Sequence, residues 1–340
     1  MSFEKFVEVT RNDTVESRHF GAAVVCDFKG SVVESWGDIN KLIFPRSALK
    51  PMLAIQLVES GAADHYALSD AELSLACSSH QGEPMHQALV QSWLNRLGLT
   101  EDHLACGAIL PEHTESAHQV LASGQQCCRI HHNCSGKHTG FLTTALHLDL
   151  PLENYHQLDH PLQQLSLEIL SDLAGIDLRQ YPMGIDGCGL PAPTMPLVQL
   201  GRTVARFARP EGLPDERAQA IYRLHRAITN EPLYIAGTGS VVSELNEVTL
   251  GAVLAKTGAE GIVTAALPGE GLGIAVKIAD GGSRARSVAL LAILDHLGAL
   301  SDVEKHQLQA HIAPKIVNSR GLEVGEIRAA ESWLSRRDAC

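Results

Sequence analysis

Residues 21–36, GAAVVCDFKGSVVESW, hold two short runs rich in β-branched residues on either side of a polar break. The break, at residues 27–30, carries the turn formers Asp27 and Gly30. Two such runs around a short glycine-containing break are typical of a β-hairpin. A hairpin alone is only marginally stable in water, so these strands require partners elsewhere in the chain.

The partner strands are predicted near the other end of the chain, in short apolar runs punctuated by glycine and proline. These runs occupy residues 249–255, 261–267 and 271–279. One antiparallel sheet could collect strands from both chain ends. Between the ends, apolar residues recur near the helical period of 3.6 in four stretches, at residues 85–97, 139–148, 161–174 and 214–228.

This order of elements predicts an α/β fold with an antiparallel sheet built from both chain ends and an inserted helical lobe. The sheet lobe would comprise about residues 1–45 and 235–340, and the mainly helical lobe about residues 46–234. We expect all 340 residues to form a single catalytic unit.

Composition excludes several classes of protein. With 45% hydrophobic and 19% charged residues, the chain can bury a large core and is not disordered. A net charge of −12 disfavours a nucleic-acid or anionic-membrane partner. We find neither a secretory signal nor an apolar run long enough to span a membrane, so we expect a cytoplasmic location. There the eight cysteines, Cys340 included, would remain thiols.

The first chemical motif is Ser47-Ala48-Leu49-Lys50, which opens an apolar-periodic helical stretch. Residues three apart on a helix lie on one face, so the two side chains would be within hydrogen-bond reach. A neutral lysine amine can take the proton of a serine hydroxyl and activate it as a nucleophile. Alone, the motif also fits a capping serine followed by a surface lysine, because matches this short occur by chance in many chains.

Two further elements extend this motif. Ser69 and Glu72 form a capping-box pattern that begins a short helix, and Cys77-Ser78-Ser79-His80 follows at its far end. Lys256-Thr257-Gly258 follows a strand-like run, and this order downstream of Ser-x-x-Lys is that of serine β-lactamases and penicillin-binding proteins. Taken singly, Ser79 and Lys256 also fit ordinary turn positions.

The last element combines Cys134-Ser135-Gly136-Lys137-His138 with Asp186-Gly187-Cys188. Two cysteines in glycine-rich turns, with Lys137 three residues after Cys134, form a candidate zinc site. Plain burial of the thiols is the alternative, because a structural site of four cysteines needs closely spaced pairs.

Together these motifs resemble those of the rhizobial-type, or class 3, L-asparaginases over nearly the whole chain. The matching segments are RSALKP at 46–51, CSSH at 77–80, CSGKH at 134–138, DGC at 186–188, KTGAEG at 256–261 and GIAVKIADG at 273–281. The resemblance implies a serine-β-lactamase-like, glutaminase-like fold and a homodimer. It also implies hydrolysis of L-asparagine to L-aspartate and ammonia through a serine acyl-enzyme.

The resemblance further assigns roles to individual residues. Ser47 with Lys50, and Ser79 with Lys256, would be two catalytic serine–lysine tandems. By the same resemblance, the substrate would be bound by Arg46, His138 and Asp186. An auxiliary zinc ion would be held by Cys134, Lys137 and Cys188. Which lysine is the base in each step stays open.

One position departs from the family pattern, because Ser240 stands where we expect an arginine. Three alternatives to an asparaginase remain: a glutaminase, a penicillin-recognising enzyme and a non-enzymatic zinc protein. A glutaminase substrate differs by one methylene, which a pocket discriminates by only about 1–3 kcal/mol. A penicillin-recognising enzyme would be exported and would carry a different second motif, and intact tandems argue against a zinc protein without enzymatic activity.

Overall fold

The computed structural model describes residues 3–124, 126–331 and 333–334, so Cys340 lies outside the described residues. The chain divides into two compact units. The sheet unit comprises residues 1–48, 195–209 and 248–340, and the helical unit comprises residues 49–194 and 210–247. Each unit is thus built from segments that are distant in sequence. That the whole chain acts as a single catalytic unit stays a prediction.

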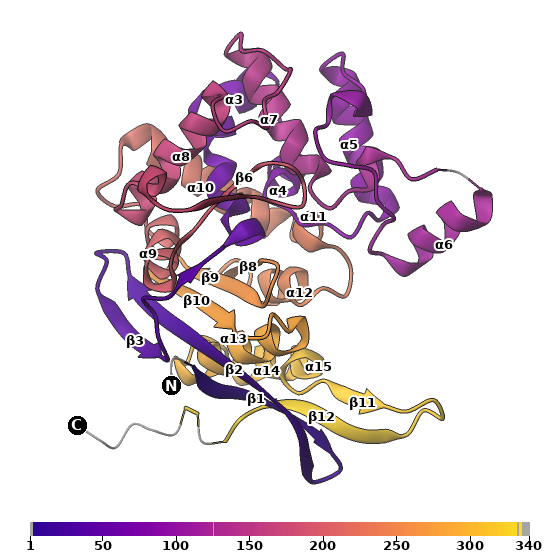
Figure 1. The fold of residues 1–340 in the computed structure, drawn as a ribbon, viewed down its shortest axis with the longest axis vertical. Coiled ribbons are helices and arrows are strands. Elements are labelled where there is room, and N and C mark those ends of the chain that lie inside the picture. The colour runs from indigo at the N-terminus through magenta and orange to yellow at the C-terminus, as the bar shows by residue number, and fades with distance from the viewer. Residues whose placement is uncertain (1–2, 125, 332, 335–340) are drawn as a thin grey trace. The chain divides into compact units, whose positions relative to one another are not determined.

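The sheet unit is built on one antiparallel sheet that takes strands from both chain ends (Figure 1), as predicted. Its order is β11-β12-β1-β2-β10-β9-β8, with β3 paired to β2. The strands are β1 (Glu4–Arg11), β2 (Thr14–Asp27), β3 (Val32–Trp36), β8 (Leu254–Thr257), β9 (Ile262–Leu267), β10 (Leu272–Ile278), β11 (Lys315–Val317) and β12 (Glu323–Ala329).

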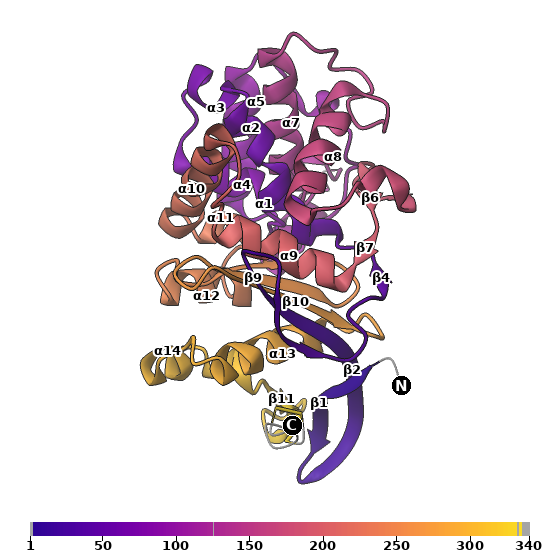
Figure 2. The same cartoon turned by 90° about the vertical axis from the view of Figure 1, so that its left-hand side faces the viewer.

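The hairpin predicted at residues 21–36 forms from β2 and β3, with Ala23 opposite Trp36. On its other edge β2 pairs with β10, where Val24 lies opposite Ala275. Residues 22–26 of β2 are all buried, because helices cover both faces of the sheet here. Figure 2 shows α9 (Leu197–Ala208) on one face and α13 (Ser283–His296) on the other. Two short helices, α14 (Asp302–Gln307) and α15 (Gln309–Ile312), follow α13.

The predicted strand at 249–255 begins later than expected. Leu250 has φ 50° and Gly251 φ 82°, both in the left-handed region, so these residues form a turn rather than extended chain. Strand β8 therefore starts at Leu254 and contains Lys256 and Thr257 instead of preceding them. A short pair, β4 (Leu42–Ile43) with β7 (Met195–Pro196), completes the unit.

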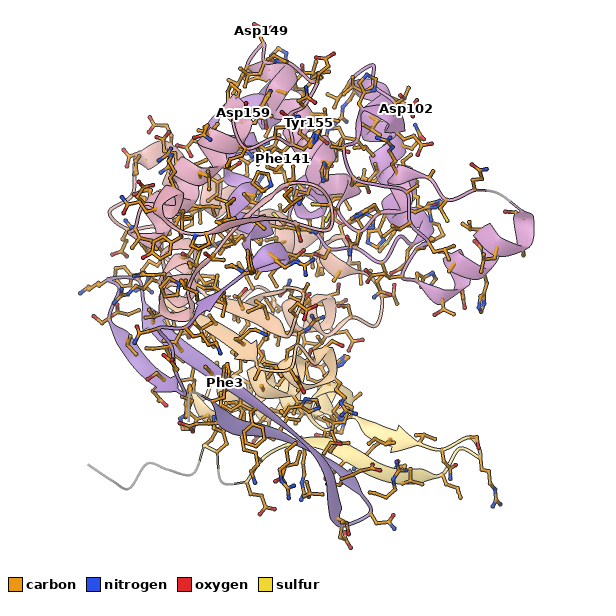
Figure 3. All side chains as sticks on the ribbon, viewed as in Figure 1. Phe3, Asp102, Phe141, Asp149, Tyr155 and Asp159 are labelled. Carbon is orange, nitrogen blue, oxygen red and sulfur yellow. The ribbon has the colours of Figure 1, made fainter. Side chains whose placement is uncertain are left out.

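The helical unit contains all four helices predicted from periodicity, as α5 (Pro84–Arg96), α7 (Ser135–His147), α8 (Pro161–Ala174) and α10 (Asp215–Asn230). The others are α1 (Lys50–Leu53), α2 (Ile55–Glu59), α3 (Ala62–His65), α4 (Asp70–Ala76), α6 (Thr114–Ser123), α11 (Leu233–Ala236) and α12 (Val241–Val248). A small hairpin pairs β5 (Met183–Ile185) with β6 (Pro191–Pro193). Phe141 and Tyr155, labelled in Figure 3, belong to the core of this unit.

Three elements of the helical unit are joined by the buried guanidinium of Arg217 on α10. It bonds both oxygens of Glu59 on α2, at 3.0 and 3.1 Å, and the Oδ2 of Asp172 on α8 at 2.5 Å. Arg217→Ala should lower the free energy of unfolding by about 2–3 kcal/mol, because Glu59 loses its bidentate partner in a half-buried setting. Urea unfolding measures this change.

The matched control is Arg226→Ala, further along the same helix. Arg226 bonds Asp70 at 3.2 Å, but its side chain is 61% exposed. This exposed pair should contribute no more than about 1 kcal/mol. Equal losses for the two variants would show that Arg217 has no special role in joining the helices.

Candidate active site

Lys50, the first residue of α1, is buried with 1% of its surface exposed. Its ammonium nitrogen donates to Ser79 Oγ at 2.8 Å and to the Ser78 carbonyl at 2.6 Å. A third, longer contact of 3.4 Å reaches the Asn133 carbonyl. Within the helical unit, Lys50 therefore contacts Ser79, so one residue from each predicted tandem forms a bonded pair.

The segment that carries Ser79 is delivered by α4. The predicted capping box is confirmed, since Ser69 Oγ accepts from the Glu72 amide and Glu72 accepts from the Ser69 amide. The helix ends at Ala76, and the Ser79 amide then donates to the Ile235 carbonyl at 3.0 Å. These bonds at both ends hold the segment in place.

Gly136 lets the first turn of α7 approach α4 closely. A Cβ at this position would lie 2.5 Å from the carbonyl oxygen of Leu75, a distance that no side chain permits. The glycine of the CSGKH motif thus brings residues 133–138 against the end of α4. As a result Asn133 and Ser79 both lie within reach of Lys50.

In the sheet unit, Ser47 lies in a 3₁₀ turn, Arg46–Leu49, that runs directly into α1. Arg46 has φ 49°, a conformation that non-glycine residues adopt at a cost and that is frequent at functional sites. A Cβ on Gly258 would lie 2.6 Å from the Pro45 carbonyl oxygen, so the Lys-Thr-Gly motif packs against this turn. Lys256 on β8 is 2% exposed, and its ammonium donates to the Thr257 carbonyl at 3.0 Å.

The predicted zinc ligands converge within the helical unit. Cys134 precedes α7, Lys137 lies in its first turn, and Cys188 follows the β5 strand. Lys137 Nζ is 3.0 Å from Cys188 Sγ, and the two cysteine side chains are hydrogen-bonded to each other. Tetrahedral zinc would separate a thiolate sulfur and an amine nitrogen by about 3.5 Å, so small shifts would admit the ion. The separation of the Lys137 and Cys188 ligand atoms is therefore compatible with zinc.

The electrostatics of this trio follow from its burial and contacts. The hydrogen bond from Cys188 holds the pKa of Cys134 well below its ordinary value. Burial alone would raise this pKa, whereas the positive charges of Lys50 and Lys137 lower it further. The same bond and burial raise the pKa of Cys188. Burial lowers the pKa of Lys137, but Cys188 and Cys134 raise it by more. Among the described residues, no group of three or more His, Cys, Asp or Glu side chains is arranged to hold a metal ion, and the proposed trio contributes only two thiols beside its lysine.

His138 presents a buried nitrogen with no protein partner. The Tyr155 hydroxyl accepts from the Ala105 amide at 2.9 Å and lies 2.6 Å from His138 Nδ1, where its own proton is satisfied if it donates to that nitrogen. Burial and the neighbouring Lys137 lower the pKa of His138, which is therefore neutral, and in the tautomer that accepts from Tyr155 its proton is on Nε2. In the part of the chain that the structure describes, nothing accepts from Nε2. Such a donor is expected to bind a ligand.

The other predicted residues are placed as follows. Asp186 lies in the turn after β5, with Oδ2 3.7 Å from Cys188 Sγ. Ser240 ends the loop 237–240, and the Thr238 amide and hydroxyl in that loop both donate to Glu83. Sequence reasoning missed the roles of Asn133 and Tyr155, because a backbone carbonyl and a distant hydroxyl leave no pattern in the sequence.

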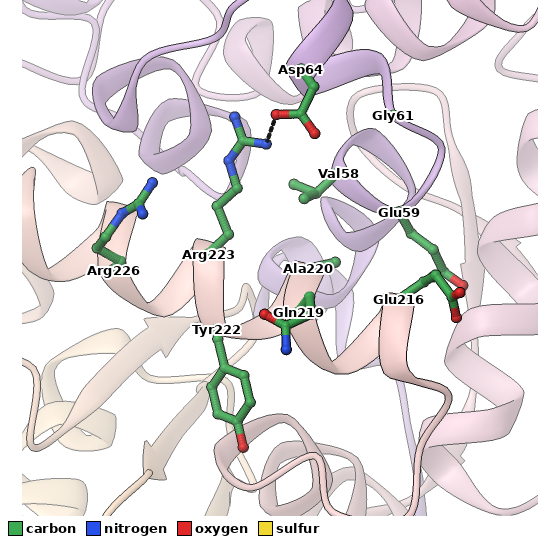
Figure 4. A pocket seen from close by; sticks show the side chains of 10 residues that line it. All are labelled: Val58, Glu59, Gly61, Asp64, Glu216, Gln219, Ala220, Tyr222, Arg223 and Arg226. Carbon is green, nitrogen blue, oxygen red and sulfur yellow. Dashed lines mark hydrogen bonds and ion pairs between the residues drawn. The ribbon is translucent and has the colours of Figure 1, made fainter.

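An open pocket of about 480 Å³ lies between α2, α3 and α10 (Figure 4). Several of its charged groups already have protein partners: Arg223 bonds Asp64 at 2.6 Å, and Glu59 is held by Arg217. None of the residues predicted to be functional lines it. We assign it no part in the chemistry.

Comparisons with known proteins identify a family for this chain. A search of curated protein sequences finds no match. Among solved structures, Mglu in its native form is 16% identical with a TM-score of 0.47, covering 82% of this chain and 64% of that chain. A β-lactamase from Mycobacterium bovis is 13% identical with a TM-score of 0.42, covering 81% of this chain and 94% of that chain. The chain thus spans less than two thirds of the length of Mglu.

The L-asparaginase II family model matches residues 7–329, nearly the whole chain. The protein therefore belongs to the L-asparaginase II family, that of the rhizobial-type, class 3 asparaginases, which confirms the resemblance read from the motifs. No helix among residues 3–124, 126–331 and 333–334 is long and apolar enough to cross a membrane.

Proposed function

We propose that the protein hydrolyses L-asparagine to L-aspartate and ammonia through a serine acyl-enzyme. The observation that carries this proposal is the buried Lys50, whose nitrogen lies 2.8 Å from Ser79 Oγ. A lysine removed from water beside a serine hydroxyl is suited to move a proton.

In the proposed reaction Ser47 Oγ attacks the side-chain amide carbon of asparagine, and its proton passes to the serine–lysine system. The leaving nitrogen takes up a proton and departs as ammonia, which leaves a β-aspartyl ester on Ser47. Water then cleaves this ester and releases aspartate. Lys50 is our first candidate for the base, and its bond to Ser79 supports a proton path through that hydroxyl.

The substrate's charged ends have candidate partners. The unpartnered Nε2–H of His138 is suited to the α-carboxylate, with Arg46 as a second candidate, and Asp186 is suited to the α-ammonium. A buried donor without a partner costs about 1–3 kcal/mol, which a bound carboxylate would recover.

The direct test is an ammonia-release assay with asparagine and glutamine, run beside a β-lactam hydrolysis assay. We expect turnover of asparagine, with glutamine turned over slowly or not at all because one extra methylene must be accommodated. Faster turnover of glutamine would make the protein a glutaminase, and β-lactam hydrolysis without amide hydrolysis would reject the proposal.

We propose zinc as an auxiliary cofactor held by Cys134, Lys137 and Cys188, with water in the fourth position. A bound ion would supply positive charge and fix three side chains beside His138. Its binding requires Cys188 and Lys137 to lose their protons, since both have raised pKa values in the metal-free site. Zinc affinity should therefore rise with pH, with release of roughly two protons per ion.

Replacing either thiol tests this site. Cys134→Ser and Cys188→Ser should lose stoichiometric zinc, and their KM for asparagine should rise by about 10- to 100-fold while kcat falls less. Metal analysis, calorimetry in buffers of different ionisation enthalpy and steady-state kinetics measure these effects. Absence of zinc from wild-type protein prepared with excess zinc would sink the site, and total inactivation of folded variants would sink the auxiliary role.

Cys106→Ser is the matched control. Cys106 belongs to the same buried core, and burial raises the pKa of its thiol to about 12. It is outside the proposed ligand set, so this variant should keep its zinc and its KM. Zinc loss in all three variants would point to general disruption of the core.

We propose a homodimer from the resemblance, and a cytoplasmic location from the sequence features given above. Sedimentation velocity at several concentrations tests the oligomeric state, and cell fractionation tests the location. A monomer at all concentrations would contradict the first, and an exported protein the second.

A further inference from the structure

We propose that His80 is a positioning residue for the Lys50–Ser79 pair, because its buried imidazole ties the segment that carries Ser79 to the first turn of α7. The inference rests on the proposed function for its kinetic consequence. Its structural basis is a chain of hydrogen bonds through His80, a side chain with none of its surface exposed.

The hydrogen bonds define which ring nitrogen carries the proton. The Gly82 amide donates to His80 Nδ1 at 3.0 Å, so that nitrogen is the acceptor. Ser135 Oγ donates to the Ile130 carbonyl at 2.9 Å, so it accepts from elsewhere. The 2.9 Å contact between His80 Nε2 and Ser135 Oγ is then a donation from the histidine.

This bridge runs beside the contacts of Lys50. The Lys50 ammonium bonds the carbonyls of Ser78 and Asn133 and so links the two segments. The bond from His80 to Ser135 links the same segments two residues further along each of them. The hydrogen bond between the neutral side chains of His80 and Ser135 thus helps to fix the distance between the two carbonyls that Lys50 bonds. Loss of that bond would let the segments separate and move Ser79 Oγ away from Lys50.

The neighbourhood of His80 keeps the bridge in one form. Its ring stacks on His86 with centroids 4.8 Å apart, and His86 is held by the Glu83 amide and the Leu233 carbonyl. Burial lowers the pKa of His80, and so do the neighbouring His86, Lys50 and His132. Cys134 acts in the opposite direction, but the net shift is downward. A neutral ring keeps Nδ1 available to Gly82 while Nε2 donates to Ser135.

The test compares two amides at position 80. The glutamine amide can reach the place of Nε2 and donate to Ser135, whereas the asparagine amide reaches only the place of Nδ1. His80→Asn should lower kcat by about 10- to 100-fold, as expected for misplaced catalytic groups, while KM changes little. His80→Gln should restore most of kcat. Ser135→Ala should reproduce the loss, and the double variant His80→Asn with Ser135→Ala should be no worse than either single one.

His86→Gln is the control for a purely structural role, since His86 is equally buried in the stack but has no bond to α7. It should keep kcat near the wild-type value. A normal kcat in His80→Asn would overturn the proposal. So would equal losses of kcat in His80→Asn, His80→Gln and His86→Gln, if those losses follow the loss of thermal stability.

A readout without turnover separates this inference from the proposed function. Nitrogen-15 NMR should show a histidine protonated only at Nε2, whose signals vanish in His80→Asn; a ring protonated at Nδ1 would overturn the bridge. If wild-type protein releases no ammonia from asparagine, the proposed function fails while the NMR result still decides the bridge. If asparagine is hydrolysed and His80→Asn turns over normally, only the positioning role fails.

Discussion

Ser47→Ala is expected to abolish asparagine hydrolysis, with kcat falling by more than about 10⁴-fold, as for loss of a catalytic nucleophile. The alanine removes the only atom that can form the acyl-enzyme in the proposed reaction. Folding should be unaffected, because Ser47 is half-buried in a turn whose Ala48 amide bonds the Pro45 carbonyl without help from the hydroxyl. Ammonia release, thermal unfolding and trapping of the acyl-enzyme by mass spectrometry measure the three effects.

Ser79→Ala is the matched control, since Ser79 is the serine bonded to Lys50. We expect it to slow turnover by about 10²-fold while the acyl-enzyme still forms, because a proton path is lost but the nucleophile remains. If the acyl-enzyme forms on Ser79, or if folded Ser47→Ala keeps wild-type turnover, then Ser79 is the nucleophile and Ser47 has the auxiliary role.

Lys50→Met is expected to lower kcat by about 10²- to 10⁴-fold, the range for loss of general acid–base catalysis. Methionine keeps most of the apolar stem that fills this buried position, so the variant separates the amine from its packing. The carbonyls of Ser78 and Asn133 would lose a donor, and some loss of stability should accompany the loss of rate.

Lys5→Met controls for removal of a lysine charge as such, because Lys5 is a partly exposed strand residue paired with Glu8. It should leave kcat unchanged. A Lys50→Met enzyme that retains more than about a tenth of wild-type kcat would remove Lys50 as the base.

The sequence predicted the sheet and the helices well where local chemistry decides structure. The valine-rich runs of residues 21–36 formed β2 and β3, and Ser69 with Glu72 began α4 through a capping box. Such features depend on side chains only a few residues apart. The same reasoning failed at Leu250 and Gly251, since left-handed backbone at these residues interrupts an otherwise apolar run.

By itself, the sequence determined the types of residue that can do the chemistry and the class of fold that carries them. Spacing within motifs identified Ser47, Lys50, Cys134 and Lys137 as candidates, because i and i+3 positions share a helix face. Only the tertiary structure decided the partners. Lys50 bonds a hydroxyl 29 residues away, and Lys137 meets a thiol 51 residues away. The close packing of Gly136 against Leu75 brings these segments together, and no local pattern encodes a contact between surfaces so distant in the chain.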